Sequence, residues 1–243
     1  MRDIWTVMLK EWKELSLWDG GWSSILSLAA FVALIGVFLP WQVGPPWITA
    51  PWVMLFWSWM PLFLVTTITA DSFAGERERR TLETLLATRL PDWAILFGKV
   101  GAAVAWVWAG TLICLPTGVV TVNLSRPTGG LLLYEPGGVV GIAAVALLAG
   151  VLGSALGVLV SLRASSVRQA QQTLTVCVLS FFMLPLFGLK LLPAAWLGRL
   201  LDLFMAGDTA GVAFALGTVF AAFDAVLLML ALARFQRGRL LLD

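Results

Sequence analysis

Residues 71–99 read DSFAGERERRTLETLLATRLPDWAILFGK, and this stretch determines how the rest of the chain is organised. Long hydrophobic segments precede and follow it. Between them lies a dense group of charges, which consists of Glu76, Arg77, Glu78, Arg79, Arg80, Glu83 and Arg89. Because a charge is costly to bury in hydrocarbon, we expect these side chains to lie in water or against a partner protein.

The composition indicates a polytopic membrane protein. Of 243 residues, 60% are hydrophobic and only 12% are charged, whereas about 25% of a typical soluble domain is charged. The chain has 13 Trp residues and several apolar runs of about twenty residues. A lipid bilayer can bury this much apolar surface more readily than one soluble core can. The net charge of +2 is small and scattered, so we expect no nucleic-acid partner.

The residue types present exclude several kinds of chemistry. The chain has no His, which removes imidazole catalysis and His-ligated metal sites, and its 2 Cys cannot form a four-cysteine zinc site. Cys114 and Cys177 fall in hydrophobic segments and are interpreted as small buried residues rather than as a disulfide. We therefore expect no catalytic residue, no metal and no enzymatic activity from this chain by itself.

Six hydrophobic segments are long enough to cross a hydrocarbon core of about 30 Å as helices. We predict an all-α permease of one domain, residues 1–243, with spans at about 22–39, 52–69, 93–120, 139–162, 170–192 and 210–233. The Pro- and Gly-rich residues 40–51 and residues 121–138 are predicted as loops. An aromatic belt at the outer surface is expected from Trp47, Trp52, Trp57 and Trp59.

Two further helices are expected at the membrane surface. Residues 3–17 place Ile4, Met8, Trp12 and Leu15 on one stripe, which indicates an interfacial helix, the alternative being a simple cytoplasmic tail. Residues 193–208 also carry apolar residues at helical spacing. They predict a short amphipathic or re-entrant helix before the sixth span, the alternative being a loop.

The positions of Lys and Arg predict the orientation. If the N-terminus is cytoplasmic, only three of the 16 basic residues, Arg126, Lys190 and Arg199, face outward. The other thirteen are Arg2, Lys10, Lys13, Arg77, Arg79, Arg80, Arg89, Lys99, Arg163, Arg168, Arg234, Arg237 and Arg239. The positive-inside rule therefore predicts a multi-pass protein of the cell membrane with both termini cytoplasmic.

The charged stretch itself has helical spacing. Glu76 precedes Arg80 by four residues and Glu83 follows Arg79 by four, so ion pairs along one helix are available. A short apolar stripe lies on the same helix and consists of Leu82, Leu85 and Leu86. These features fit a docking helix, and they also fit an ordinary solvated connection between two spans.

The run ERERRTLETLLATRLPDWAILFGK, residues 76–99, resembles the first cytoplasmic connection of type-2 permeases of ABC transporters. The usual form there is E-x-E-R-G-T-L-E-x-L-L-A-T-P-L-S, with a G-K pair some residues later. The matching positions are Glu76, Glu78, Arg79, Thr81, Leu82, Glu83, Leu85, Leu86, Ala87, Thr88, Leu90, Gly98 and Lys99. Arg80, Arg89 and Pro91 replace the usual Gly, Pro and Ser.

The resemblance implies the membrane subunit of a type V-like ABC exporter. It implies that a coupling helix at about 76–88 docks on a separate cytosolic ATPase subunit, which binds ATP and Mg²⁺, and that a second permease copy completes a homodimer or a related heterodimer. The ATPase-coupling residues would be Glu76, Glu78, Arg79, Thr81, Leu82, Glu83, Leu85 and Leu86. The chain has no G-x-x-x-x-G-K-[ST] phosphate loop, and we expect it to bind no cofactor.

Three polar residues are candidates for a substrate path. Asp224 lies near the middle of the sixth span, ten residues or roughly 15 Å from Arg234, where a carboxylate costs about 2.5–3.5 kcal/mol. Two roles remain as alternatives for Asp224: contact with a substrate or ion, and a structural hydrogen bond to a neighbouring span. Gln169 and Gln172 are candidates for lining a cytoplasmic vestibule or are ordinary interfacial residues. The alternative function is an ion-gradient-driven secondary transporter or channel.

Overall fold

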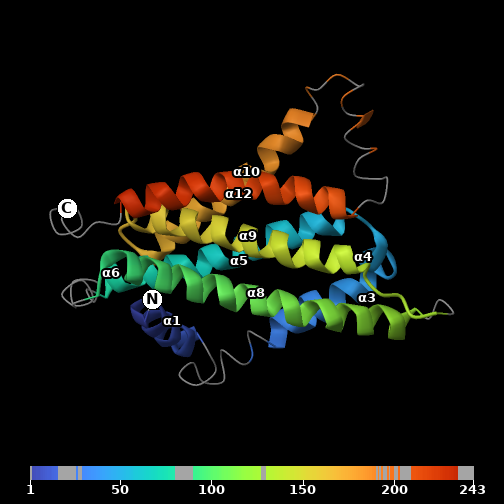
Figure 1. Cartoon of the computed structure of the whole chain (residues 1–243), viewed down its shortest axis with the longest axis horizontal. Coiled ribbons are helices and arrows are strands. Elements are labelled where there is room, and N and C mark those ends of the chain that lie inside the picture. The colour runs from blue at the N-terminus through green and yellow to red at the C-terminus, as the bar shows by residue number, and fades with distance from the viewer. Residues whose placement is uncertain are drawn as a thin grey trace.

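The computed structural model describes residues 2–15, 26, 29–79, 90–126, 130–189, 191, 193, 196, 198–199, 202 and 209–234. All secondary structure among them is helical, as predicted (Figure 1). The elements are α1 (Arg2–Leu15), η1 (Val32–Phe38), α3 (Leu39–Val43), α4 (Pro46–Thr49), α5 (Val53–Ala70), η2 (Asp71–Gly75), α6 (Glu76–Glu78), α8 (Asp92–Ser125), α9 (Pro136–Ser161), α10 (Val167–Leu189) and α12 (Thr209–Arg234). Elements η1 and η2 are π-helical.

Four helices of the described chain are long and apolar enough to cross a membrane. They are Val53–Glu78, Asp92–Ser125, Pro136–Ser161 and Ala210–Arg234, which correspond to the second, third, fourth and sixth predicted spans. A shorter apolar helix, Ala29–Val43, overlaps the predicted first span, and α10 occupies the predicted fifth. These helices establish a multi-pass membrane protein, but the predicted count of six spans is not confirmed.

Several helix boundaries differ from the prediction. The predicted loop at 121–138 is helical at both ends, because α8 continues to Ser125 and α9 begins at Pro136. The second span, predicted to end at residue 69, continues as helix through η2 and α6 to Glu78. The predicted loop at 40–51 contains most of α3, which continues the helix Ala29–Val43 past Pro40, and it also contains α4. In α4, Pro46 occupies the first turn, where Pro needs no N–H partner. Gly44 ends α3 with a φ of 74°, a conformation that favours glycine. The helix predicted at 193–208 lies largely outside the described residues.

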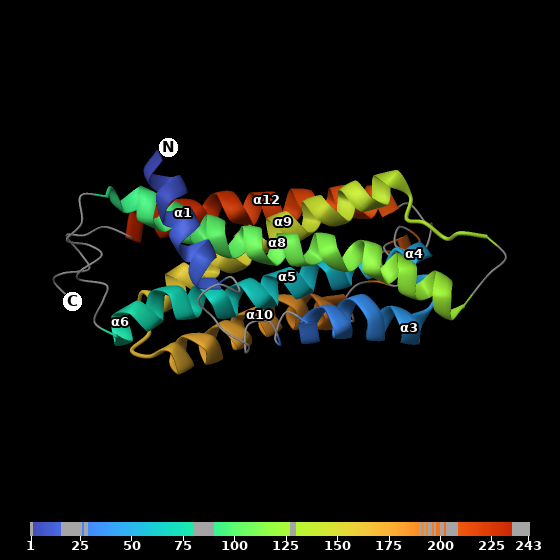
Figure 2. The same ribbon diagram turned by 90° about the horizontal axis from the view of Figure 1, so that it is seen from below.

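Helices α5 and α9 form the centre of the bundle, and α8, α10 and α12 pack around them (Figures 1 and 2). Small residues on α9 permit this contact. A Cβ on Gly153 would lie 2.6 Å from the carbonyl oxygen of Leu62, and a Cβ on Gly157 would lie 2.8 Å from Cβ of Thr69. The hydroxyls of Thr69 and Ser154 lie 3.2 Å apart in the same contact. Small residues therefore allow this helix pair to pack closely.

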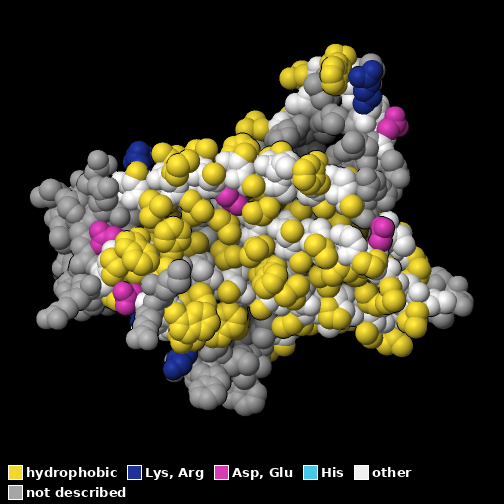
Figure 3. Space-filling model, in the orientation of Figure 1, with side chains coloured by type: hydrophobic (Ala, Val, Ile, Leu, Met, Phe, Trp, Pro, Cys, Tyr) yellow, Lys and Arg dark blue, Asp and Glu magenta, His cyan; other side chains and the backbone are white. Residues whose placement is uncertain are grey.

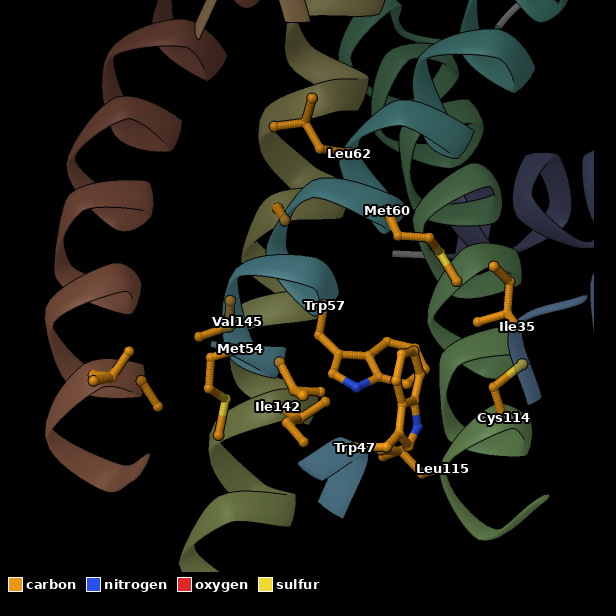
Figure 4. Close-up of a cluster of buried hydrophobic side chains, with 14 of the residues drawn as sticks. Ile35, Trp47, Met54, Trp57, Met60, Leu62, Cys114, Leu115, Ile142 and Val145 are labelled. Atoms are coloured by element: carbon orange, nitrogen blue, oxygen red, sulfur yellow. The ribbon is translucent and has the colours of Figure 1, made fainter. Parts of the chain in front are cut away.

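A large apolar core lies at the α4 end of the bundle (Figure 4). Trp47 and Trp57 are fully buried there, with ring centroids 6.2 Å apart in an edge-to-face arrangement. The predicted outer aromatic belt is therefore wrong for these two residues, while Trp52 and Trp59 are exposed. Figure 3 shows that hydrophobic side chains cover most of the visible face of the long helices, as a surface in contact with lipid requires.

Candidate functional site

The candidate site lies where the N-terminal helix α1 crosses α8, at the end of the bundle that carries α6 (Figure 2). The predicted stripe of α1 faces inward, and its buried and half-buried residues are Ile4, Val7, Met8, Glu11, Trp12 and Leu15. The ring centroids of Trp12 and Trp106 lie 5.2 Å apart across the contact. The helix is therefore held by protein on its apolar face, rather than by lipid alone.

Gly98 makes the close approach of α1 possible. A Cβ at this position would lie 2.6 Å from both Cβ and Cγ1 of Val7 and 3.2 Å from the carbonyl oxygen of Ile4. At Gly101, one turn further along α8, the nearest atom is the flexible Sδ of Met8 at 3.3 Å. Only a residue without a side chain therefore fits at Gly98 unless α1 moves.

Lys99, the next residue of α8, is the centre of a buried polar cluster. Its Nζ lies 2.8 Å from Oε1 of Glu11 on α1 and 2.9 Å from Oε1 of Glu76 on α6. It also donates to Oγ of Ser72 at 3.0 Å and to the Ser72 carbonyl at 3.2 Å, and Oγ of Ser72 donates to Oε2 of Glu11 at 3.2 Å. Lys99 is 3% exposed and Glu11 6% exposed. We call Glu11, Ser72, Glu76 and Lys99 the lysine cluster.

The lysine cluster joins three parts of the chain through charge-assisted hydrogen bonds, which are stronger than neutral ones. Its single cation faces two carboxylates, and Lys10 supplies a second positive charge at the rim, 3.7 Å from Oε1 of Glu11. Partial burial lowers the pKa of Lys10, but the hydrogen bond to Glu14 and the carboxylates of Glu11 and Glu76 outweigh it and raise that pKa above its ordinary value. Glu14 lies 3.1 Å from Lys10, so the lysine cluster and its rim together hold two cations and three carboxylates.

The π-helical turn η2 positions Ser72 in the lysine cluster. Such turns interrupt the regular i to i−4 ladder and often occur at functional sites. Here η2 directly precedes α6, so the Ser72 hydroxyl, the Ser72 carbonyl and the Glu76 carboxylate all reach Lys99 from the end of one continuous helix. The end of the second span is thus bound to the start of the third.

A second set of contacts joins α6 to the connection between α9 and α10. Nη1 of Arg77 donates to the carbonyl of Leu162 at 2.8 Å, and Oε2 of Glu78 accepts from the backbone N–H of Val167 at 3.1 Å. The carboxylate of Glu78 therefore caps the N-terminus of α10, where the helix dipole favours a negative charge. Arg79 lies 3.6 Å from Asp71 on the exposed side.

These contacts change the interpretation of the charged stretch. Glu76 was expected in water or against a partner protein, and that expectation is wrong, because its side chain is only 17% exposed and binds Lys99 of the same chain. Arg77 and Glu78 are exposed but bind the chain itself. The remaining predicted coupling residues, Thr81, Leu82, Glu83, Leu85 and Leu86, lie outside the described residues, as does Arg80.

The three residues predicted for the substrate path are not brought together. Asp224 on α12 is 5% exposed, and neither of its carboxylate oxygens has a hydrogen-bond partner in the described part of the chain. Gln169 lies near the end of α12, beside Arg234, and its Oε1 accepts from Ser165 N at 2.9 Å and Ser165 Oγ at 2.8 Å. Gln172 is exposed. About 15 Å of helix separates Asp224 from that end.

Sequence reasoning missed Glu11 and Ser72. A signal for Glu11 was present, because this charged residue falls on the same helical face as Val7, Met8 and Leu15, where a charge requires a buried partner. Ser72 carried no comparable signal. Lys99 matched a motif position, but the motif does not name its partners.

The helices and the lysine cluster define a multi-pass membrane protein whose N-terminal helix is bound to α6 and α8. Residues 31–239 match the model of the ABC-2 family transporter proteins. The chain belongs to this family and is a transmembrane transporter permease, which confirms the resemblance seen at residues 76–99. A comparison with curated proteins found no match.

Proposed function

We propose that this chain is the permease subunit of an ATP-driven exporter and couples to a separate cytosolic ATPase subunit through the segment at about 76–88. In this proposal two permease copies, identical or related, assemble with two ATPase subunits. ATP and Mg²⁺ bind to the ATPase, while this chain binds no cofactor and catalyses no hydrolysis by itself. The permease lies in the cell membrane with both termini in the cytoplasm.

One observation carries the coupling proposal. The helix that begins at Val53 continues through the π-helical turn η2 into the charged segment and ends at Glu78. A displacement of Glu76–Glu78 would therefore act directly on the second span, because one helix contains both. Lys99 and Glu11 extend this connection to α8 and α1.

The contacts of α6 with the α9–α10 connection support the same proposal. Arg77 donates a hydrogen bond to the carbonyl of Leu162, just after α9, and Glu78 accepts one from the N–H of Val167, at the start of α10. Movement of the charged segment would thus reach the fourth and fifth predicted spans as well as the second and third. A segment that served only as a solvated connection would need none of these contacts.

Six spans are part of the proposal. Helix α10 has 23 residues, which is about 34 Å of helix and exceeds a hydrocarbon core of about 30 Å. The apolar helix Ala29–Val43 would be completed as the first span by the hydrophobic residues that precede it in the sequence. Six crossings place the N- and C-termini on the same side, together with thirteen of the 16 basic residues.

An ion-gradient-driven transporter or channel is the second candidate, and Asp224 is the observation that favours it. Buried carboxylates in spans commonly mark ion pathways. The other acidic residues of the four long apolar helices lie in the last eight residues of Val53–Glu78 or at the first residue of Asp92–Ser125, so none of them lies near Asp224 at the middle of its helix to form a relay. Membership of the ABC-2 family favours the ATP-driven mechanism.

The docking proposal is tested by reversing one charge in the segment. Glu83→Lys is expected to reduce the amount of ATPase subunit that co-purifies with the permease and to reduce transport. Glu135→Lys is the matched control, because it makes the same change at the opposite end of the bundle, before α9. If Glu83→Lys assembles and transports as the control does, docking through this residue is refuted.

A further inference from the structure

A cavity of about 480 Å³ opens between α9, α10 and α12, at the end of the bundle that also carries α6. Its polar lining consists of Arg163, Gln169, Thr173 and Arg234. The volume falls in the range of small-ligand sites, about 300–1,000 Å³. We call this cavity the arginine pocket. It does not include Asp224 or any residue of the lysine cluster.

The arginine pocket is cationic. Neither Arg163 nor Arg234 forms an ion pair with a carboxylate of the described chain, and no Asp or Glu lines the cavity. Glu78 of α6 contacts the adjoining α9–α10 connection, and its carboxylate already accepts the N–H of Val167. Two guanidinium groups that line one cavity, and that pair with no carboxylate among the residues the structure describes, suit a phosphate group, which they can bind in bidentate fashion.

The cavity is also layered. On α12, Leu230 precedes Arg234 by four residues and lies about 6 Å deeper in the bundle. On the other side of the cavity, Leu159 lies within α9, and Arg163 lies in the turn that follows the end of α9 at Ser161. Both Leu residues line the same cavity. A cationic layer at the mouth thus lies above an apolar layer. A soluble anion would use the first layer only, whereas a molecule with a phosphate and a hydrocarbon chain would use both.

We propose that the arginine pocket binds an anionic phospholipid of the membrane leaflet next to this end of the bundle. The phosphate lies between Arg163 and Arg234, with the hydroxyl of Thr173 as a further donor, and the first part of an acyl chain lies against Leu159 and Leu230. Basic pockets between spans are known to suit anionic lipid headgroups. With the proposed orientation this is the cytoplasmic leaflet, but the binding site itself requires neither ATP nor an ATPase partner.

The test measures retention of phosphatidylglycerol by the purified full chain, using native mass spectrometry after reconstitution in mixtures of phosphatidylglycerol and phosphatidylcholine. The wild-type chain is expected to prefer phosphatidylglycerol, and Arg163→Gln/Arg234→Gln is expected to bind it roughly 10- to 30-fold more weakly. Arg168→Gln is the control, because Arg168 is exposed at the same end of the bundle but does not line the cavity.

Two further arms separate the sources of the phosphate. Glycerol 3-phosphate and inorganic phosphate, added at millimolar concentration, are expected not to displace the lipid, and Leu230→Ala is expected to weaken lipid retention. Displacement by either soluble anion would overturn the lipid assignment. An equal loss in Arg168→Gln, or no preference for phosphatidylglycerol over phosphatidylcholine, would overturn the site altogether. None of these outcomes depends on co-purification of an ATPase. The lipid proposal and the proposed function can therefore be refuted independently of each other.

Discussion

Replacing Lys99 by Met removes the cation of the lysine cluster and keeps an apolar side chain of similar length. The carboxylates of Glu11 and Glu76 would then face each other and Ser72 without the ammonium group that lies 2.8 and 2.9 Å from them. Removing one partner of a buried ion pair typically destabilises a protein by about 3–5 kcal/mol, because the remaining charge is left buried.

The expected loss for Lys99→Met lies at the lower end of that range. Glu76 is 17% exposed and can gain some hydration, and Lys10 remains 3.7 Å from Glu11. We therefore expect a loss of about 3 kcal/mol, which corresponds to a decrease in Tm of roughly 6–12 °C for a chain of this length.

Thermal unfolding of the purified chain in nanodiscs measures this loss. Lys10→Met is the control, because Lys10 also contacts Glu11 but its side chain is 53% exposed, so its removal is expected to cost no more than about 1 kcal/mol. Lys99→Met/Glu11→Gln/Glu76→Gln is expected to recover much of the stability, since no buried charge is left. If Lys99→Met and Lys10→Met unfold at the same temperature, the lysine cluster does not hold α1, α6 and α8 together.

Two further substitutions test the packing of α1 and the state of the buried carboxylate. Gly98→Ala is expected to displace α1 and to expose it to limited proteolysis. Gly101→Ala is the control, because its added Cβ meets only a flexible Met sulfur at 3.3 Å. Equal protease resistance of the two variants would contradict the close contact at Gly98. Asp224→Asn is expected to leave Tm unchanged or higher, because it removes a buried charge that has no described hydrogen-bond partner, and to abolish substrate-stimulated ATP hydrolysis in the assembled complex. Unchanged stimulation would exclude Asp224 from the substrate path.

Hydrophobic periodicity predicted the long helices and the inner face of α1, because burial in lipid or against α8 requires a continuous apolar surface. It misplaced the end of the second span for a physical reason. Ser72 and Glu76 are polar and indicated an exit from the membrane region, but Lys99 satisfies them within the protein, so the helix continues. Lys99 pairs with Glu76, which is 23 positions away in the sequence, and with Glu11, which is 88 positions away. Such pairs depend on how the helices are rotated relative to one another, which hydropathy does not determine.

The tryptophans show a similar limit. Hydropathy assigns the same value to a Trp at the water–lipid boundary and to a Trp in a core. Trp52 and Trp59 are exposed, while Trp47 and Trp57 pack edge to face inside the bundle. The burial of Trp47 depends on α4, a short helix that places Trp47 against α5. The Pro content of this segment had predicted a loop.

The adjacency of Gly98 and Lys99 has a geometric explanation. Successive residues of a helix point about 100° apart, so one position of α8 can receive the backbone of α1 while the next reaches toward both α1 and α6. On α1, Val7 contacts Gly98, and Glu11, one turn later on the same face, reaches Lys99. Without the close approach at Gly98, the carboxylate of Glu11 would not reach the Lys99 ammonium group. A displacement of α6 must therefore either break the Glu76–Lys99 contact or move α8 and α1 as well. The second outcome is the one by which a docked partner could move the spans.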